Sequence, residues 1–305
     1  MTGAILVGVD GEPEHRSALT WAVERAMRDG TDLELVYVIE RSWGDRLDEP
    51  MDDLVRAAEG VLAAEREAAA RIAGRVSSTT GATARGSGIG DRPPQITTGY
   101  RYGHVGAELT EASRGAGLLV LGSRVGSERE RERRFSGSLQ VRTAATAACS
   151  VAVVPHGWER GGTAAAGVVV GVDGQAPSEA AVAFAADEAD ALGEPLRIVC
   201  VGYAANPLLA GLVPEVSLGD RRQRIVAEAA ESARAAHPSI AVSADVVEAS
   251  PARGLVAAAE GRRMLVVGTH DRRSAERLML GSVAHDVLLN VRVPVVVARE
   301  HRGSA

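Results

Sequence analysis

The stretch Ile5-Leu-Val-Gly-Val-Asp-Gly11 recurs as Val168-Val-Val-Gly-Val-Asp-Gly174 in the second half of the chain. Each copy is a short apolar run that ends in Asp-Gly, and a run of small residues follows it, from about Ser17 or Ser178. Buried parallel strands are apolar on both faces, and a crossover helix follows them. The two stretches therefore predict two units that begin with the same strand, turn and helix.

Further features recur in the same order in both halves of the chain. The matched pairs are Leu118–Ser123 with Leu265–Thr269, Gly137-Ser138 with Gly281-Ser282, and Ser150–Pro155 with Val293–Ala298. Matched features in a fixed order are the signature of an internal repeat. Because the 305 residues are enough for two domains, we predict a first domain at 1–156, a flexible linker at 157–166 and a second domain at 167–300.

Each predicted domain alternates apolar runs with Ala-rich stretches of helical periodicity. We predict strands near 4–9, 33–39, 95–101, 118–122 and 150–154, and again near 167–172, 196–201, 240–248, 264–268 and 294–298. A helix at about 52–75 has one apolar face, formed by Leu54, Ala58, Val61, Leu62, Ala68 and Ile72. This alternation is typical of the α/β class. We expect two tandem Rossmann-like domains, each with a five-stranded parallel sheet flanked by helices.

The composition limits the classes of function. The net charge is −6, and all 34 cationic residues are Arg. This excludes a phosphate loop that ends in Gly-Lys and a Lys Schiff base, and it argues against nucleic acid as a partner. The two cysteines, Cys149 and Cys200, lie in or beside apolar runs, which suits a reducing compartment. No apolar run reaches the ~18 residues of a membrane span, so we expect a soluble, cytoplasmic protein.

The candidate site begins with the aspartate that ends the first strand of each copy, Asp10 or Asp173. Parallel sheets bind ligands at the carboxyl ends of their strands, where a carboxylate can accept hydrogen bonds from a ribose or a base. The alternative is that each aspartate only forms the turn, because Asp-Gly is a common turn sequence.

The fourth strand of each copy leads into a glycine-containing segment. The first copy has Gly122, Gly126, Gly137 and Ser138, and the second has Gly268, Gly281 and Ser282. Glycines let backbone amides approach a phosphate, and a helix that begins at the Gly-Ser pair offers free N–H groups. Strand-to-helix turns also favour Gly and Ser for purely structural reasons.

These motifs resemble the universal stress protein family over nearly the whole chain, twice in tandem. The resemblance implies the adenine nucleotide alpha hydrolase-like fold. It also implies ATP, with or without Mg²⁺, as the ligand of Asp10, Gly122, Gly126, Gly137 and Ser138, and of Asp173, Gly268, Gly281 and Ser282. Two departures stand out, since the first copy has a loop two residues longer than the family pattern, and Asp271 replaces a glycine in the second copy.

The sequence holds no constellation that predicts catalysis or a metal site. No two of the seven histidines are three or four residues apart, and no Gly-x-Ser-x-Gly elbow is present. The charged insert at 127–136 is best explained by ion pairs on a solvated surface. We therefore expect a non-catalytic, adenine nucleotide-binding module that acts in stress adaptation through unidentified protein partners. The alternatives are a scaffold with degenerate sites and a slow ATPase.

Assembly is also predicted from the last strand of each copy. The family commonly pairs through this strand, and apolar edges invite such pairing. Residues 151–154 and 293–297 would then pair within the chain as a pseudo-dimer, with a homodimer of chains as a further possibility.

Overall fold

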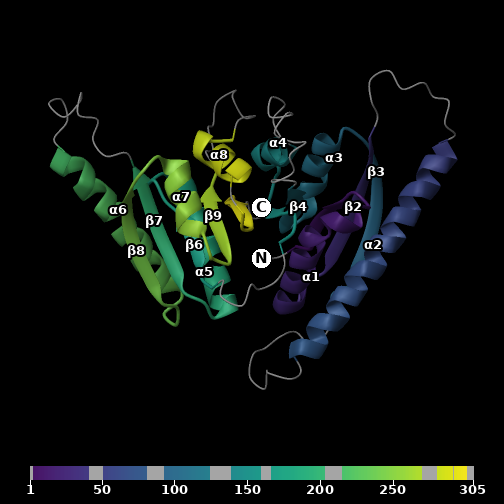
Figure 1. Ribbon diagram of the computed structural model, residues 1–305, viewed down its shortest axis with the longest axis horizontal. Coiled ribbons are helices and arrows are strands. Elements are labelled where there is room, and N and C mark those ends of the chain that lie inside the picture. Colours follow the sequence, from purple (N-terminus) through teal and green to yellow (C-terminus); the bar gives the residue numbers. More distant parts are fainter. Residues whose placement is uncertain are drawn as a thin grey trace. The chain divides into compact units, whose positions relative to one another are not determined.

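The computed structural model describes residues 3–40, 51–80, 93–123, 139–158, 166–202, 215–269, 280–290 and 292–300. The chain forms two compact units, Met1–Arg160 and Gly161–Ala305. Both have the alternating strand and helix order expected from the repeat (Figure 1). We call them unit 1 and unit 2 and describe each by itself.

Unit 1 contains a five-stranded parallel sheet. Its strands are β1 (Ile5–Val9), β2 (Leu33–Glu40), β3 (Ile96–Gly103), β4 (Leu118–Ser123) and β5 (Ser150–Pro155). The strand order is β3-β2-β1-β4-β5, with Ile5 opposite Leu33 on one side and Leu118 on the other. Strands β2 and β3 therefore lie on one side of β1, and β4 and β5 lie on the other. This reversal of the strand order creates a switch point between β1 and β4.

Helices cover both faces of the unit 1 sheet. They are α1 (Ser17–Asp29), α2 (Met51–Thr80), α3 (Val105–Ala112) and α4 (Leu139–Thr146). Helices α1 and α2 contact each other over one face, and α3 and α4 contact each other over the opposite face. A short 3₁₀ turn, Pro13–His15, joins β1 to α1.

Unit 2 repeats this architecture. Its strands are β6 (Val168–Gly171), β7 (Leu196–Gly202), β8 (Val242–Glu248), β9 (Met264–Gly268) and β10 (Val295–Ala298). They are parallel in the order β8-β7-β6-β9-β10. Its helices are α5 (Ala176–Leu192), α6 (Glu215–Ala236), α7 (Pro251–Ala259) and α8 (Ser282–Asn290). The predicted α/β class with two tandem parallel sheets is thus confirmed.

Helix α2 is longer than its sequence predicts. Helix α2 continues to Thr80, beyond the predicted end near residue 75. The hydroxyl of Ser78 donates to the carbonyl of Arg75, one turn back, so a polar residue fits this last turn.

The sheet cores consist of aliphatic side chains. Val7, Leu119, Val169 and Leu265 are fully buried in β1, β4, β6 and β9. Burying one such side chain stabilises a fold by about 1.5–3 kcal/mol. The central strands are therefore the rigid base that carries the loops at their carboxyl ends.

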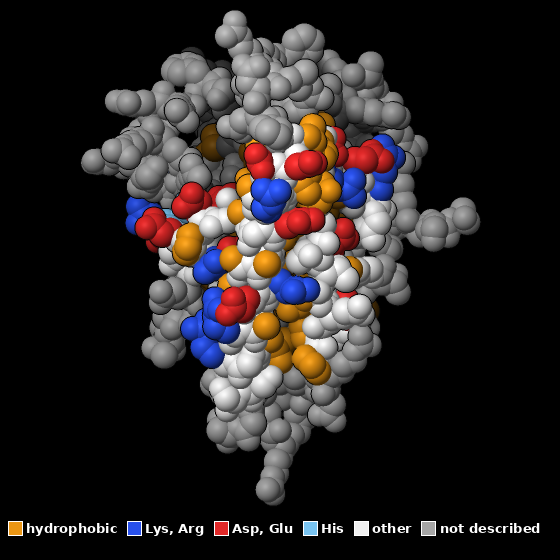
Figure 2. All heavy atoms as spheres, turned by 90° about the vertical axis from the view of Figure 1, so that its right-hand side faces the viewer, with side chains coloured by type: hydrophobic (Ala, Val, Ile, Leu, Met, Phe, Trp, Pro, Cys, Tyr) orange, Lys and Arg blue, Asp and Glu red, His pale blue; other side chains and the backbone are white. Residues whose placement is uncertain are grey.

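The outer face of unit 1 mixes charges of both signs (Figure 2). On α2, Arg56 pairs with Asp53 and Arg71 pairs with Glu67, one turn away in each case. Such exposed pairs contribute little stability, on the order of 0.3–0.5 kcal/mol each. Among the described residues, no helix is long and apolar enough to span a membrane.

Candidate functional site

The turn after β1 holds Asp10 in a fixed position. One carboxylate oxygen of Asp10 accepts the backbone N–H of Glu12 at 3.0 Å, and Gly11 has a φ of 81°. This is the left-handed conformation that glycine adopts without strain. A Cβ on Gly11 would also lie 2.9 Å from Val61 on α2. The Asp-Gly pair therefore forms the turn, as the structural alternative predicts. The turn leaves the Asp10 carboxylate half-exposed at the sheet edge.

Two histidines lie beside this carboxylate. Nδ1 of His15 is 2.6 Å from the second carboxylate oxygen of Asp10. The ring of His15 meets the ring of His156 edge to face, with centroids 5.6 Å apart. His156 directly follows β5, and its backbone N–H donates to the carbonyl of Ser123 at 2.7 Å. The ends of β1, β4 and β5 thus bring one carboxylate and two imidazoles together.

A buried ion pair supports the same region. The guanidinium of Arg16 donates to Glu65 Oε1 through Nη2 at 2.7 Å and through Nε at 3.0 Å. The side chain of Glu65 is only 3% exposed, whereas that of Arg16 is 25% exposed. The bond to Glu65 raises the pKa of Arg16 above its ordinary value. The pair ties the start of α1 to the middle of α2 and so fixes the segment that carries His15.

These groups surround a cavity of about 410 Å³ at the carboxyl edge of the unit 1 sheet. This volume lies within the range of about 300–1,000 Å³ that small-molecule pockets occupy. The lining combines apolar strand residues with Asp10, His15, Arg16, Glu65, Gly122, Ser123, Gln140 and His156. Gln140 on α4 donates to the carbonyl of Gly122 at 2.7 Å, which holds the start of α4 against the end of β4.

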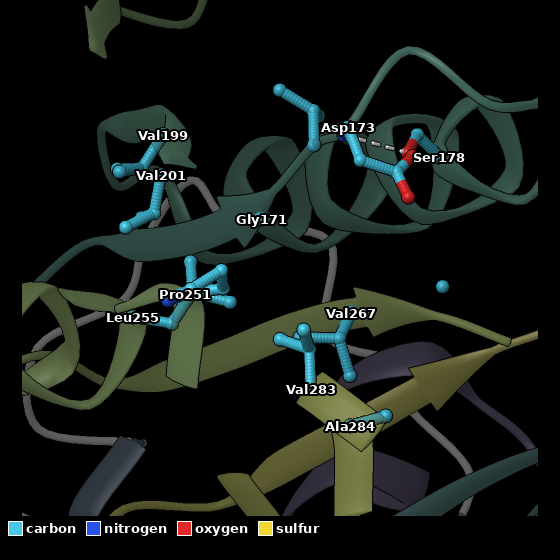
Figure 3. A pocket seen from close by; sticks show the side chains of 12 residues that line it. Gly171, Asp173, Ser178, Val199, Val201, Pro251, Leu255, Val267, Val283 and Ala284 are labelled. Carbon is cyan, nitrogen blue, oxygen red and sulfur yellow. Dashed lines mark hydrogen bonds between the residues drawn. The ribbon is translucent and has the colours of Figure 1, made fainter. Parts of the chain in front are cut away.

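The corresponding cavity of unit 2 is smaller and more apolar. Its volume is about 140 Å³, and aliphatic side chains from β7, α7, β9 and α8 face into it (Figure 3). Asp173 and Ser178 form its polar side. The Ser178 hydroxyl donates to Asp173 Oδ1 at 2.6 Å and accepts the backbone N–H of Asp173 at 3.1 Å. Ser178 therefore occupies the position that His15 has in unit 1, five residues after the aspartate.

The repeated domain is recognised over both units. The Universal stress protein family matches residues 1–155 and 167–299. The chain belongs to the universal stress protein family. As a tandem universal stress protein, it resembles relatives of similar length. One from Mycobacterium tuberculosis strain H37Rv is 27% identical over 306 residues, which cover 97% of this chain and 96% of the relative.

A second universal stress protein from the same strain is 28% identical over 312 residues, covering 97% of this chain and 94% of the relative. Among solved structures, that of a universal stress protein from Archaeoglobus fulgidus has a TM-score of 0.68 at 18% identity. It covers 97% of this chain and 96% of the other. This structural likeness shows that the fold is that of a universal stress protein.

The structure places four of the predicted site residues around the two cavities. Asp10 and Gly122 line the cavity of unit 1, and Asp173 and Gly268 line that of unit 2. Gly281 and Ser282 stand at the start of α8, next to the lining residues Val283 and Ala284. The remaining three, Gly126, Gly137 and Ser138, lie outside the described residues, as does Asp271.

Sequence reasoning missed the two cavity histidines and the ion pair. Glu65 had a detectable signal, because it falls within the apolar stripe of its helix, between Leu62 and Ala68, where a charged residue needs a partner. His15 and His156 are 141 positions apart in the sequence, and nothing in their local sequence indicates that they meet. Among the described residues, no group of three His, Cys, Asp or Glu is arranged to hold a metal ion.

Proposed function

We propose that this universal stress protein binds an adenine nucleotide such as ATP in the cavity of unit 1 and acts as a non-catalytic, nucleotide-responsive module in stress adaptation. The observation that carries the proposal is the cavity itself. It lies at the switch point between β1 and β4, has the volume of a small-molecule pocket, and is bordered by Asp10 and Gly122. The sequence resemblance assigns these two residues to nucleotide binding.

The chemistry of the lining fits a nucleoside. The carboxylate of Asp10 stands at the sheet edge, and each carboxylate oxygen has more than one lone pair with which to accept a ribose hydroxyl or a base N–H. Apolar residues of β1, β2 and α3, among them Val36 and Leu109, supply surface for a flat base. A Cβ on Gly122 would make only ordinary contacts, the nearest at 3.7 Å from the backbone oxygen of His15. Packing within the described residues therefore does not require this glycine.

Unit 2 supports a weaker version of the same proposal. Asp173 and Gly268 hold equivalent positions, but the cavity they border has about 140 Å³, below the usual range of ligand pockets. We therefore assign the principal nucleotide site to unit 1 and expect unit 2 to bind more weakly or to serve in contacts with partners.

Calorimetry with ATP and Mg²⁺, together with nucleotide analysis of the denatured protein, tests this assignment. We expect one principal site per chain, lost in Asp10→Ala and retained in the matched control Asp173→Ala. Equal losses in both variants would move the site away from unit 1. Absence of nucleotide and of binding heat at millimolar ATP would refute the proposal and favour a scaffold whose sites are degenerate.

An assay for released phosphate separates this module from a slow ATPase. We expect no phosphate release above a blank without protein. Turnover that disappears in Asp10→Ala would instead identify an enzyme.

A further inference from the structure

The imidazole of His15 has one nitrogen engaged by Asp10 and one that is not. A carboxylate only accepts hydrogen bonds, so Nδ1, at 2.6 Å from Asp10 Oδ2, carries the proton of the neutral ring. Within the described residues, the ring makes no second hydrogen bond, and it lines the unit 1 cavity. Nε2 is therefore an acceptor while the ring is neutral and becomes a donor when the ring is protonated.

His156 adds a second imidazole on the same side of the cavity. Its backbone bond to Ser123 places it at the end of β4, and its ring touches that of His15. Gly122 and Ser123 line the cavity at this point. The two rings thus stand beside the strand end to which the sequence resemblance assigns phosphate binding.

The described lining of this cavity is unfavourable for an anion while both rings are neutral. Its carboxylates belong to Asp10, Glu12, Glu40 and Glu65. The guanidinium among these lining residues, that of Arg16, is bound by Glu65. A phosphate placed among these groups would meet net repulsion. A protonated imidazole carries a positive charge, so protonation of His15 and His156 weakens this repulsion beside Gly122 and Ser123.

In unit 2, the two described positions that correspond to His15 and His156 hold no imidazole. Ser178 replaces His15, and its hydroxyl both donates to the carboxylate of Asp173 and accepts the backbone N–H of Asp173. The sheet registers pair Gly122 with Val154 in unit 1 and Gly268 with Ala298 in unit 2, so the residue that corresponds to His156 is Glu300. A hydroxyl and a carboxylate stand where unit 1 has two groups that can take up a proton.

We propose that His15 and His156 are the phosphate-recognising side chains of unit 1, and that a phosphorylated ligand enters this cavity together with a proton. This inference rests on the proposed function, because it concerns the phosphate of the nucleotide assigned to the same cavity. It adds that the affinity of the unit 1 cavity for the ligand rises as the pH falls. Asp10 has a second role, because it accepts the hydrogen bond from Nδ1 of His15 and so makes Nε2 the nitrogen that takes up the additional proton.

Calorimetry with AMP and adenosine, at about pH 6 and about pH 8, tests the inference on the full chain without divalent cations. The reference protein is the double variant His15→Ser/His156→Gln, in which position 15 takes the residue that unit 2 already carries. Because the phosphate of AMP itself titrates near pH 6, the decisive quantity is the difference between the two proteins. We expect the rise in pH to weaken AMP binding about fivefold more in the wild type than in the double variant.

The outcomes distinguish this inference from the proposed function. The affinity for adenosine should change with pH to the same extent in both proteins, because adenosine has no phosphate. AMP binding with the same pH dependence in both proteins would overturn the role of the histidines and leave nucleotide binding intact. If neither AMP, adenosine nor ATP binds the wild type, the proposed function fails and this inference fails with it.

A second measurement on the unchanged protein guards against misfolding of the variant. In an NMR spectrum at about pH 7, the ring signals of two histidines should move toward the imidazolium position when AMP is added. They should not move when adenosine is added. Ring signals that do not respond to AMP, although AMP binds, would refute proton uptake by His15 and His156.

Discussion

Replacing Arg16 by Leu should destabilise unit 1 more than replacing Glu65 by Gln. The two side chains share three N–H···O contacts, yet their environments differ, because Glu65 is 3% exposed and Arg16 is 25% exposed. Loss of the guanidinium leaves a buried carboxylate without its cation. Loss of the carboxylate charge leaves a guanidinium that still reaches water.

The magnitude follows from this asymmetry. Breaking a buried pair by removing one partner costs about 3–5 kcal/mol. Partial exposure of Arg16 lowers this value, so we expect about 2–4 kcal/mol for Arg16→Leu. For Glu65→Gln we expect about 1 kcal/mol, the value of an ordinary hydrogen bond. The double variant Arg16→Leu/Glu65→Leu should recover most of the loss, because two apolar groups replace the pair without leaving an unpaired charge.

Urea unfolding followed by circular dichroism measures these differences, provided that the transition of unit 1 is resolved from that of unit 2. The matched control is Arg71→Leu, which removes an exposed pair with Glu67 on the same helix and should change stability by less than about 0.5 kcal/mol. The reasoning is refuted if Arg16→Leu costs no more than this control. It is also refuted if the double variant is as unstable as the single one.

The other predictions concern the turn, a surface histidine and the thiols. Gly11→Ala should lower the free energy of unfolding clearly more than the control Gly30→Ala, which costs only the backbone strain of positive φ, about 1 kcal/mol. Both glycines have positive φ, but an added Cβ would meet Val61 only at Gly11, so equal losses in urea unfolding would contradict this prediction. The hydrogen bond to Asp187 raises the pKa of His237, so this bond should stabilise the fold fully below about pH 6.5 and lose its effect as the pH rises through the raised pKa. His237→Gln should abolish this pH dependence of the unfolding free energy, and an unchanged pH profile would argue against the prediction. Burial raises the pKa of the Cys200 thiol, so a thiol reagent should modify it only as fast as the protein unfolds, and rapid labelling of the native chain would contradict its buried position.

Much of the fold could be predicted because its signals are local. Apolar runs bounded by Gly, Asp and Ser predict the ten strands to within about two residues of their observed ends. The repeat of Ile5–Gly11 at Val168–Gly174 predicts that the two units share one topology. The prediction was short at the end of α2, where the helix continues to Thr80 through polar residues that the periodicity of apolar residues does not mark.

The candidate site could be predicted only in part. Asp10 and Asp173 were found because each ends a strand whose edge must lie at the carboxyl side of a parallel sheet. The residue five positions after each aspartate, His15 or Ser178, is written in the sequence, but that it folds back to contact the carboxylate is seen only in the structure.

The sequence by itself therefore determined the fold class, the tandem repeat and the strand ends that carry the site. Hydrophobic periodicity and turn-forming residues are local features that span only a few residues, so the amino-acid sequence shows them directly. The tertiary structure decided that His156 meets His15, that Arg16 binds Glu65, and that the unit 1 cavity is larger than that of unit 2. These features join residues that are far apart in the sequence, and only the packing of helices on a sheet brings such residues within a few ångströms of each other.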